Sequence, residues 1–493
     1  MNNNIPANLD LAQSQKTFEG TVALALELGD VSEWDGRILK EREQQIRQAA
    51  LILAGQCIAL MLHNLAQSST AQATAAKLTQ GWRSPTSTGD GKRPVKILTL
   101  GNVVVSLWLP YVVERPKRQS PQVEAKRRKP KGQGFYPFLR WLSMDEHITP
   151  LVWSTIAQYG ILSASFAAAR DTLNAWGIAV SLKRLERLTY RFGHLGLFRR
   201  TQSVNQFRQG NLPTKSILKE QRVVISVDGG RSRIRRTKMG KPRQTTNRHG
   251  YYGDWTEPKL LTIYVVDEQG KRINTDVLPV TNDGTFSDVE TFMQLLETHL
   301  VRLGINQAKQ VLLIADGAEW IWLRIPSLLK RLGCPPESIY ELLDFYHAAE
   351  HLQQFVQAAF TEPTVVHAWF KQARKDLKGA RVANLIARMQ TLVENSSGER
   401  QKTLAGQLAY FTTGQKHQRL NYSQVRARKL PIGSGAIESL IRQVVNLRLK
   451  GTGKFWLLNH AEIVLHARCQ WAAGKWAWAN FCDSILTAML YPA

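Results

Sequence analysis

The chain has 493 residues, a formal net charge of +26 and a hydrophobic fraction of 43%. At roughly 100–200 residues per domain, this length predicts several domains, and the apolar content is sufficient for their cores. The excess of lysine and arginine predicts a polyanionic partner. It favours nucleic acid over a membrane surface, because the basic residues are spread along the chain and not gathered on one amphipathic helix.

Targeting signals and cysteine motifs are not evident in the sequence. The amino terminus lacks the basic-then-apolar layout of a signal peptide, and the nearest candidate for a membrane span, 151–169, carries several polar residues and favours buried helices. The cysteines are far apart and form no Cys-x-x-Cys, so neither a zinc ribbon nor a disulfide framework is indicated. We therefore expect a cytoplasmic, nucleoid-associated protein with no membrane partner.

The first third of the chain reads as helices, a hairpin and a linker. Residues 35–66 carry apolar side chains at helical spacing, whereas 95–100 and 103–113 read as a hairpin around Gly101-Asn102. The basic, proline-bearing run 115–133 is typical of a solvated linker, and such a linker also suits phosphate contacts.

A helix-turn-helix pattern follows. Residues 165–175 form one predicted helix, Trp176-Gly177-Ile178 interrupts it, and Ser181 is placed to cap a second helix. The outward face of that second helix is basic, with Lys183, Arg184, Arg187 and Arg191. The alternative is an ordinary helical hairpin with a solvated charged face.

Two buried strands end in the same dipeptide. Residues 223–230 are mostly Val and Ile and end at Asp228-Gly, and residues 310–317 end at Asp316-Gly. Functional groups gather at the carboxyl ends of strands in open α/β sheets, so the two carboxylates are candidates to share a divalent cation. The alternative is that each Asp-Gly starts a turn.

The sheet region is predicted to continue around these strands. Residues 259–266 and 272–280 read as strands joined by a turn, 285–303 as a helix capped by Ser287, and 339–343 as a strand. The first three strands can pair antiparallel, and the later crossovers favour parallel pairing. Residues 231–250 read as a basic loop.

Helices are predicted for most of the remaining chain. Residues 346–430 carry helical spacing, a further helix after Gly435 bears Glu438 in its first turn, and the tail 454–493 is helical and Trp-rich. The tail tryptophans Trp456, Trp471, Trp476 and Trp478 suit a core more than base stacking. His460 and His466, on either side of Glu462, match no standard metal motif, so core or surface positions are favoured.

Asp228, Asp316 and Glu438 together form a hypothetical catalytic constellation. Hard divalent cations prefer oxygen ligands, and Mg²⁺ typically takes one or two carboxylates together with water and substrate phosphates. A pair of ions about 3.5–4 Å apart can activate an attacking hydroxyl and stabilise the leaving oxygen of a phosphodiester. The expected cofactor is therefore Mg²⁺ or Mn²⁺.

Five segments resemble a known family. They are Ser226-Val-Asp-Gly-Gly230, Ala315-Asp-Gly317, Leu343-Asp-Phe-Tyr-His-Ala-Ala-Glu-His-Leu352, Ile432-Gly-Ser-Gly-Ala-Ile-Glu-Ser439 and Gln443-Val-Val-Asn-Leu-Arg-Leu-Lys-Gly451. Together they resemble DDE insertion-sequence transposases of the Kra family, which are Mutator-like, over roughly residues 134–476. The resemblance implies an α/β, ribonuclease H-like mixed sheet interrupted by an all-helical insertion, and preceded by helical and helix-turn-helix DNA-binding regions.

The same resemblance implies roles for individual residues. It makes Asp228, Asp316 and Glu438 the metal-binding triad, and it matches Asp344 and His347 to an Asp-x-x-His signature. His347 is expected near the scissile phosphate or flipped DNA and not on zinc, with a helix-start histidine as the alternative. Paired cysteines that relatives often carry after the amino-terminal hairpin are absent here, so no zinc site is carried over.

The predicted function is that of a transposase acting on double-stranded DNA, both terminal inverted repeats and target, with a homodimer on paired ends. The alternatives are a stand-alone ribonuclease H-like endonuclease and a catalytically inactive DNA-binding regulator. The expected DNA contacts are basic: Lys183, Arg184, Arg187, Arg191, Arg231, Arg233, Arg235, Arg236, Lys238, Arg442, Arg448 and Lys450.

The predicted regions follow in chain order. They are a helical region (1–94), a hairpin and basic linker (95–134), a helix-turn-helix domain (135–218), the first catalytic part (219–345), the helical insertion (346–430), the second catalytic part (431–453) and the tail (454–493).

Overall fold

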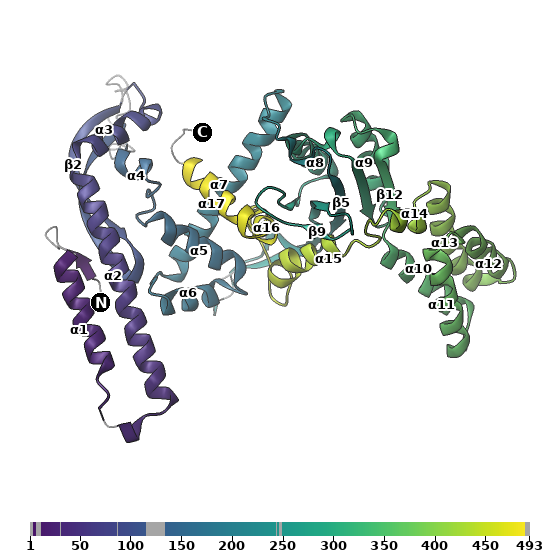
Figure 1. Cartoon of the computed structure of the whole chain (residues 1–493), viewed down its shortest axis with the longest axis horizontal. Helices are drawn as coiled ribbons and strands as arrows, with labels where there is room; N and C mark the ends of the chain where they lie inside the picture. Colours follow the sequence, from purple (N-terminus) through teal and green to yellow (C-terminus); the bar gives the residue numbers. More distant parts are fainter. Residues whose placement is uncertain are drawn as a thin grey trace. The chain divides into compact units, whose positions relative to one another are not determined.

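The computed structural model describes residues 3–5, 11–29, 31–85, 87–114, 134–242, 244–245 and 249–488. The predicted basic linker 115–133, with Arg243 and Arg248, lies outside the described residues. The chain divides into two compact units (Figure 1): unit 1 is Met1–Arg199 with Phe481–Ala493, and unit 2 is Arg200–Asn480.

Unit 1 is mostly helical and contains one small sheet. Its elements are β1 (Asn3–Ile5), α1 (Leu11–Leu26), η1 (Val31–Glu33), α2 (Gly36–Gln67), α3 (Ser69–Leu78), η2 (Gln80–Trp82), β2 (Ser87–Leu98), η3 (Leu100–Asn102), β3 (Val103–Glu114), β4 (Gly134–Phe135), α4 (Pro137–Trp141), α5 (Pro150–Leu162), α6 (Phe166–Ala175) and the first part of α7 (Leu182–Arg208).

The long helix α2 confirms the prediction for 35–66. Asp35 caps it by accepting hydrogen bonds from the backbone N–H groups of Arg37 (2.7 Å) and Ile38 (3.2 Å). One face of α2, including Ala59 and Leu62, enters a core with the β2–β3 hairpin. By length and composition α2 also passes a test for a membrane-crossing helix, and it is the one described helix that does so, although core helices pass the same test.

The predicted hairpin is confirmed. Strands β2 and β3 pair antiparallel, with Leu98 opposite Val104, and Gly101 and Asn102 turn the chain at positive φ of 63° and 60°. Helix α2 approaches this turn closely at Gly55, where a Cβ would lie 2.0 Å from the Leu100 carbonyl oxygen and 2.9 Å from Val103 Cγ2. Only glycine fits between helix and turn.

We therefore expect Gly55→Ala to destabilise the protein by about 1–3 kcal/mol, because the added methyl forces the turn away from α2. The measurement is the free energy of unfolding in denaturant. Gly20→Ala in α1 is the matched control, since a Cβ there meets nothing within 4 Å, and it should leave stability unchanged or raised. Equal effects of the two substitutions would contradict this close contact.

The helix, turn and second helix predicted at 165–192 are also present. Ser165 caps α6 through the Ala168 N–H (3.1 Å), and Ser181 caps α7 through the Arg184 N–H (3.3 Å). Helices α5 and α7 cross at Gly160, where a Cβ would overlap the Thr189 side chain. Helix α5 carries six buried residues, as expected for the apolar window 151–169.

Unit 2 is α/β, with a mixed sheet and many helices. Its elements are the end of α7, η4 (Ser216–Leu218), β5 (Arg222–Gly229), β6 (Ser232–Met239), β7 (Gly250–Thr256), β8 (Lys259–Val266), β9 (Arg272–Ile273), β10 (Thr281–Thr285), α8 (Val289–Leu303), η5 (Ile305–Gln307), β11 (Gln310–Ala315), α9 (Glu319–Arg331), η6 (Pro336–Ser338), β12 (Ile339–Leu343), α10 (Phe345–Ala359), α11 (Pro363–Lys378), α12 (Val382–Glu394), α13 (Gly398–Lys416), α14 (Tyr422–Ala427), α15 (Gly435–Ile441), the π-helix η7 (Arg442–Leu449), α16 (Leu458–Ala472) and α17 (Lys475–Ala488), whose last residues belong to unit 1.

The main sheet has the strand order β10-β8-β5-β11-β12, and β9 pairs with β8. Pairing is antiparallel from β10 through β8 to β5 and parallel from β5 through β11 to β12. Because β5, β8 and β11 are buried along almost their whole lengths, they read as unbroken apolar runs in the sequence. The predicted antiparallel meander followed by parallel crossovers is therefore confirmed in its pairing directions.

The predicted third strand, 272–280, is wrong in its extent. Only Arg272–Ile273 pair as a strand, and the next strand of the main sheet is Thr281–Thr285. The side chain of Asn274 holds the intervening loop, donating to the Ala473 carbonyl oxygen (3.0 Å) and accepting from the Val280 N–H (3.2 Å). A tertiary contact with the tail thus replaces strand pairing.

Two further predictions need correction. Helix α8 is capped by Asp288, which accepts from the Thr291 N–H (2.9 Å), whereas Ser287 donates its own N–H to Thr285. Within the predicted basic loop 231–250, residues 232–239 form β6, which pairs antiparallel with β7 as a separate two-stranded sheet.

The predicted helical block and tail are confirmed as helices. Helices α10–α13 form a bundle beyond β12 (Figure 1), in which α10 packs against α11 and α13. The predicted helix after Gly435 is present: it begins as α15 and continues as η7 to Leu449.

Candidate functional site

The carboxyl ends of β5 and β11 bring Asp228 and Asp316 together. Val227 pairs with Ala315 in the parallel register, so the next residues along both strands are neighbours. Adjacent strands lie about 4.8 Å apart, and residues in register point to the same face. The two carboxylates that the sequence selected therefore stand side by side.

The surroundings of Asp228 disfavour its ionised form. Burial raises the pKa of this carboxyl to about 6, and the nearby Asp316 and Glu257 carboxylates add to the rise, whereas the Gly229 N–H bond and His347 oppose it. The Gly229 N–H donates to Asp228 Oδ1 at 2.6 Å. A positive charge between Asp228 and Asp316 would relieve this repulsion, which is the electrostatic character of a cation site.

Asp316 is held at the start of the following turn. Its Oδ1 accepts from the Ala318 N–H (3.1 Å), and its carbonyl oxygen accepts from Trp322 Nε1 (2.8 Å). Asp316 therefore does start a turn, as the alternative interpretation of Asp-Gly predicted. This role is compatible with a cation site, because the turn uses only one of the two carboxylate oxygens.

Glu438 is exposed on α15, which packs against β5 and β8. Its Oε1 accepts a hydrogen bond from Ser434 Oγ (3.1 Å), and the Ser434 N–H donates to Asp344 Oδ2. No three His, Cys, Asp or Glu side chains among the described residues lie close enough to hold a metal. Two residues of the predicted triad, Asp228 and Asp316, are thus adjacent. In its present rotamer the Glu438 side chain does not form a three-residue cluster with them.

Asp344 is a structural residue in this arrangement. It follows β12, in register with Asp316, and is fully buried. One carboxylate oxygen caps α10 through the His347 N–H (2.7 Å), and the other binds the Ser434 N–H. The carboxylate therefore joins the sheet edge to both α10 and the segment that carries Glu438.

His347 lies in the first turn of α10 close to Asp228, whose pKa it lowers. Its backbone N–H is capped by Asp344, as the helix-start alternative required, while its side chain is 38% exposed with Nδ1 3.5 Å from Glu350 Oε2. Backbone and side chain therefore have separate contacts. His351 faces a different neighbour, stacking on Tyr410 with ring centroids 4.0 Å apart.

Tyr410 is a site residue that the sequence did not indicate. It comes from α13, and a Cβ on Gly317 would lie 2.9 Å from its Cε2. Burial, together with the Asp344 and Asp316 carboxylates, raises its pKa. Its buried hydroxyl has no hydrogen-bond partner among the described residues. No local pattern marks this residue, because only the tertiary fold brings α13 to the sheet edge.

Because the Tyr410 hydroxyl forms no hydrogen bond with the part of the chain that the structure describes, Tyr410→Phe should leave the free energy of unfolding unchanged or raise it by up to about 1 kcal/mol. Tyr340→Phe is the contrast, since that hydroxyl accepts from Arg428 Nε at 2.9 Å, and it should lower stability slightly. The measurement is denaturant unfolding without nucleic acid. A clear loss of stability in Tyr410→Phe would mean that the hydroxyl has a partner in solution.

The predicted DNA-contacting residues occupy different environments. On α7, Lys183 is exposed, whereas Glu146 engages the others: Arg187 Nη1 lies 2.5 Å from Oε2, Arg191 Nε 3.9 Å from Oε1, and Arg184 donates to the backbone carbonyl at 3.5 Å. The basic face of the second helix is therefore partly neutralised by Glu146.

One predicted phosphate contact is corrected. Arg448 is 3% exposed, with its guanidinium 5.2 Å from the ring of Trp456, so it is a core residue that phosphate does not reach in this conformation. Arg442 and Lys450 on the same segment are exposed. Trp456 and Trp478 are buried, as the core interpretation expected, whereas Trp471 and Trp476 are exposed, and Trp471 packs edge-on against Trp478.

The tail histidine His466 is likewise a core residue, as predicted. Its Nδ1 lies 2.9 Å from the fully buried carboxylate of Asp283, which also binds His299 and Arg200. Glu462 accepts from Arg200 Nη2 at 2.6 Å. This buried charged network was not predicted, since its members are far apart in sequence.

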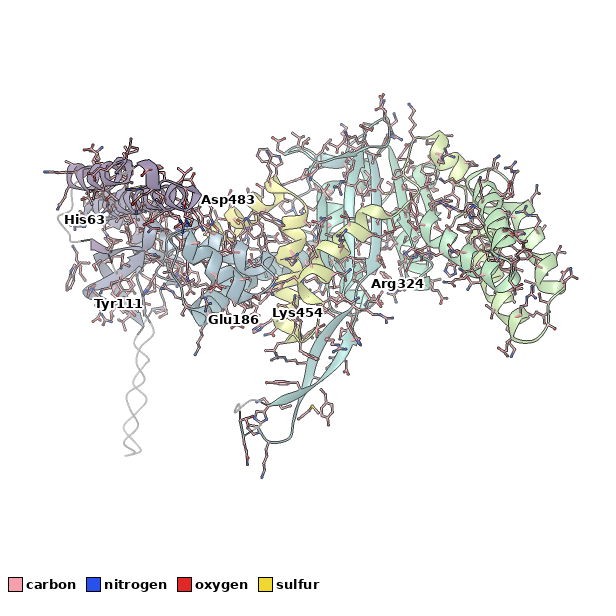
Figure 2. The ribbon with its side chains drawn as sticks, turned by 90° about the horizontal axis from the view of Figure 1, so that it is seen from below. His63, Tyr111, Glu186, Arg324, Lys454 and Asp483 are labelled. Atoms are coloured by element: carbon pink, nitrogen blue, oxygen red, sulfur yellow. The ribbon has the colours of Figure 1, made fainter. Side chains whose placement is uncertain are left out.

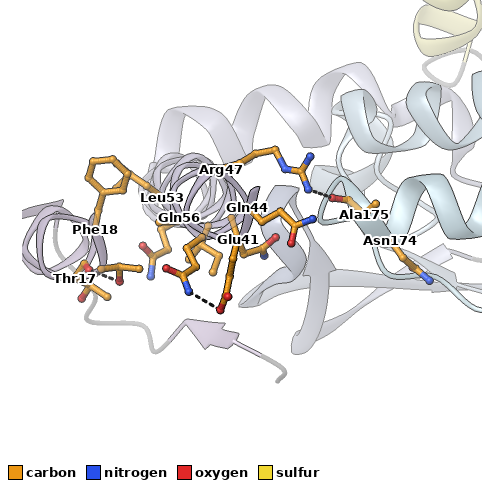
Figure 3. Close-up of a pocket in the computed structure, with 14 residues that line it drawn as sticks. Thr17, Phe18, Glu41, Gln44, Arg47, Leu53, Gln56, Asn174 and Ala175 are labelled. Carbon is orange, nitrogen blue, oxygen red and sulfur yellow. Dashed lines mark hydrogen bonds between the residues drawn. The ribbon is translucent and has the colours of Figure 1, made fainter. Parts of the chain in front are cut away.

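A cavity in unit 1 lies away from the carboxylate pair. It has a volume of about 630 Å³ and lies between α1, α2 and the end of α6, lined by residues such as Phe18, Gln44 and Asn174 (Figure 3). No titratable cluster converges on it, so it suggests no chemistry.

No family model matches the chain, and no curated protein matches its sequence. Among solved structures, the chain is similar to the Drosophila P element transposase strand transfer complex, with a TM-score of 0.28 and 10% identity over 64% of this chain and 90% of that chain. A TM-score this low does not establish a common fold. The function therefore has to be argued from this chain's own residues.

Proposed function

We propose that this protein is a DNA transposase that binds the ends of an insertion sequence and catalyses metal-dependent phosphodiester hydrolysis and strand transfer. The observation that carries the proposal is the placement of Asp228 and Asp316, in register on adjacent parallel strands with their carboxylates on one face. The pKa of Asp228, raised by burial and by Asp316, adds the electrostatic character that a divalent cation would relieve.

The strand order supports a ribonuclease H-like reading of the sheet. Three antiparallel strands are followed by two parallel ones, with crossover helices between them. In this reading α10–α14 are the helical insertion, and α15 with η7 completes the catalytic domain. Four of the five sequence segments that resemble Kra-family transposases fall on the strand ends and helix starts of this arrangement, and the fifth, 443–451, covers η7 and the residues after it.

The residues present suit a hard cation. We propose that Asp228 and Asp316 hold it, because Mg²⁺ takes one or two carboxylates together with water and phosphate oxygens. Glu438 is proposed as a third ligand, and in this structure its Oε1 accepts from Ser434 Oγ instead. When bound, Mg²⁺ or Mn²⁺ supplies a more acidic water and neutralises charge on the phosphate.

The reaction proposed is a pair of substitutions at phosphorus. A water oxygen forms a bond to phosphorus while the bond from phosphorus to the 3′-oxygen breaks, and the leaving oxygen takes up a proton. The freed 3′-hydroxyl then attacks a phosphodiester of target DNA in the same way. His347, near Asp228, is proposed to contact the phosphate undergoing substitution.

Basic residues are proposed to bind double-stranded DNA. In unit 2 the exposed cations are Arg231, Arg233, Arg236, Lys238, Arg442 and Lys450, and in unit 1 Lys183 on α7 is exposed. Phosphate contacts position DNA without reading it and make affinity steeply salt-dependent. A homodimer on paired ends is part of the same proposal.

The test is to incubate the full chain with its own flanking DNA and Mg²⁺ or Mn²⁺ and to map the cut positions. We expect cleavage at the element ends, abolished in Asp228→Ala and Asp316→Ala while binding persists, with Asp276→Ala as a surface control. Cleavage by Asp228→Ala would show that the site is wrong. Cutting without preference for the ends would favour a stand-alone nuclease, and binding without cutting would favour a regulator.

A further inference from the structure

The β6–β7 hairpin is an arm that starts three residues after the candidate catalytic strand. Strand β5 ends at Gly229 and β6 begins at Ser232. Its two strands pair with each other and not with the main sheet. Figure 2 shows the pair projecting from the body of unit 2. An arm in this position can reach nucleic acid bound at Asp228.

The base of the arm is fixed to the body. The Arg235 N–H donates to the Trp456 carbonyl oxygen (2.8 Å), and the Trp456 N–H donates to the Arg233 carbonyl oxygen (3.0 Å). Ser232 Oγ donates to the Leu449 carbonyl oxygen (3.2 Å), which also accepts from Trp456 Nε1 (3.1 Å). These bonds hold the arm at a defined angle, so its side chains are presented in fixed positions.

One face of the arm is a ladder of guanidinium groups and aromatic rings. Arg233 lies opposite Trp255, with its guanidinium 4.8 Å from that ring and 5.5 Å from Phe455. Arg235 lies 4.8 Å from the Tyr251 ring. The Phe455 ring packs against the backbone of Gly253, where an added Cβ would lie only 2.9 Å from Phe455 Cδ1. The stacked arginines are thereby held in place while their charge stays available.

The arm exposes large aromatic side chains on both faces. Trp255 is 51% exposed on the ladder face, and Tyr252 is 60% exposed on the other face, opposite the bulge between Arg235 and Lys238. Residues 231–256 contain one acid, Asp254, which pairs with Arg236 at 3.2 Å. A strongly basic surface that displays flat aromatic rings complements a polyanion that itself carries flat rings.

We propose that the β6–β7 arm binds unpaired bases of the DNA being processed, with Trp255 and Tyr252 as the stacking residues and the arginines on the adjoining phosphates. Bases inside a duplex are covered by their neighbours, so these rings gain a partner only where the strands are open. One aromatic residue on each face lets the arm stand between two separated strands. This inference rests on the proposed DNA function of the carboxylate site.

The test compares two fluorescently labelled duplexes of the same length, one fully paired and one with a short central bubble, bound to the full chain in EDTA so that no cutting occurs. Loss of one stacked base corresponds to about tenfold in affinity. We therefore expect Trp255→Ala to weaken binding to the bubble about tenfold and to change binding to the paired duplex less than about twofold. Trp255→Phe should keep most of the affinity.

Two controls separate stacking from charge and from general damage. Lys238→Ala should weaken binding to both duplexes alike and lower the salt dependence by about one phosphate contact. Trp476→Ala, a partly exposed tryptophan of unit 2, should change neither affinity. Trp255→Ala and Trp255→Phe should both have the melting temperature of the wild-type protein, because the Trp255 side chain is half exposed.

A 2-aminopurine placed in the bubble gives a direct readout of stacking. Its fluorescence should fall on binding the wild-type protein and not on binding Trp255→Ala. Equal weakening on both duplexes, or none on either, would overturn the inference and leave the arm as a phosphate contact. If the protein prefers the bubble duplex but does not cleave element ends, the proposed base stacking by the arm is supported and the transposase proposal fails. If it cleaves element ends but does not prefer the bubble duplex, the transposase proposal is supported and the proposed base stacking fails.

Discussion

Asp228→Asn is expected to raise the thermal stability of the protein above pH 7 in EDTA while abolishing DNA cleavage. The pKa of Asp228 in the folded state is about 6, against an ordinary value of 3.8. The native state therefore binds more protons than the unfolded chain between these values, and stability falls as pH rises through this window. Well above pH 6 the ionised carboxylate costs about 3 kcal/mol, which a neutral amide of the same shape avoids.

The measurement is the melting temperature from pH 4 to pH 8. Wild type should lose stability as the pH rises through 4–6 relative to Asp228→Asn, and the exposed Asp276→Asn should follow wild type. Added Mg²⁺ or Mn²⁺ should stabilise wild type more than Asp228→Asn, because the amide cannot replace the charge of a carboxylate ligand. A lower melting temperature for Asp228→Asn in EDTA would show that this carboxylate is structural.

Asp283→Ala is expected to destabilise the protein by about 3–5 kcal/mol, because it removes the buried centre of a charged network. Asp283 is fully buried and accepts hydrogen bonds from His299 Nε2 (2.9 Å), His466 Nδ1 (2.9 Å), Arg200 Nη1 (3.3 Å) and the Gly284 N–H (2.8 Å). The substitution leaves the Arg200 charge in the core with Glu462 as its remaining acidic partner.

Denaturant unfolding measures this loss. Asp254→Ala is the control, since its ion pair with Arg236 is exposed and should contribute at most about 1 kcal/mol. The partners hold the pKa of Asp283 well below its ordinary value, so its contribution is present above the unfolded-state pKa near 3.8 and is lost as pH falls further. A change of less than about 1 kcal/mol for Asp283→Ala would contradict the account of this network as a structural element.

The sequence by itself determined the elements whose signals are local. The apolar runs of β5, β11 and β12 and the aspartates at their carboxyl ends are read directly from the chain, and so is the cap of α7 at Ser181. Parallel pairing followed from the crossovers. Because the carboxyl ends of parallel strands meet at one edge of a sheet, the juxtaposition of Asp228 and Asp316 was also within reach of the sequence.

The tertiary structure alone decided the features that depend on distant segments. The charge of residues 231–250 obscured the alternation of β6, which pairs with β7 and with the backbone of Trp456. Contact with the tail ended the predicted strand at Ile273, and stacking on Trp456 placed Arg448 in the core. Long-range packing likewise places Tyr410 beside Gly317 and Asp283 between His299 and His466. In each case the contacting residues come from elements that are far apart in the chain.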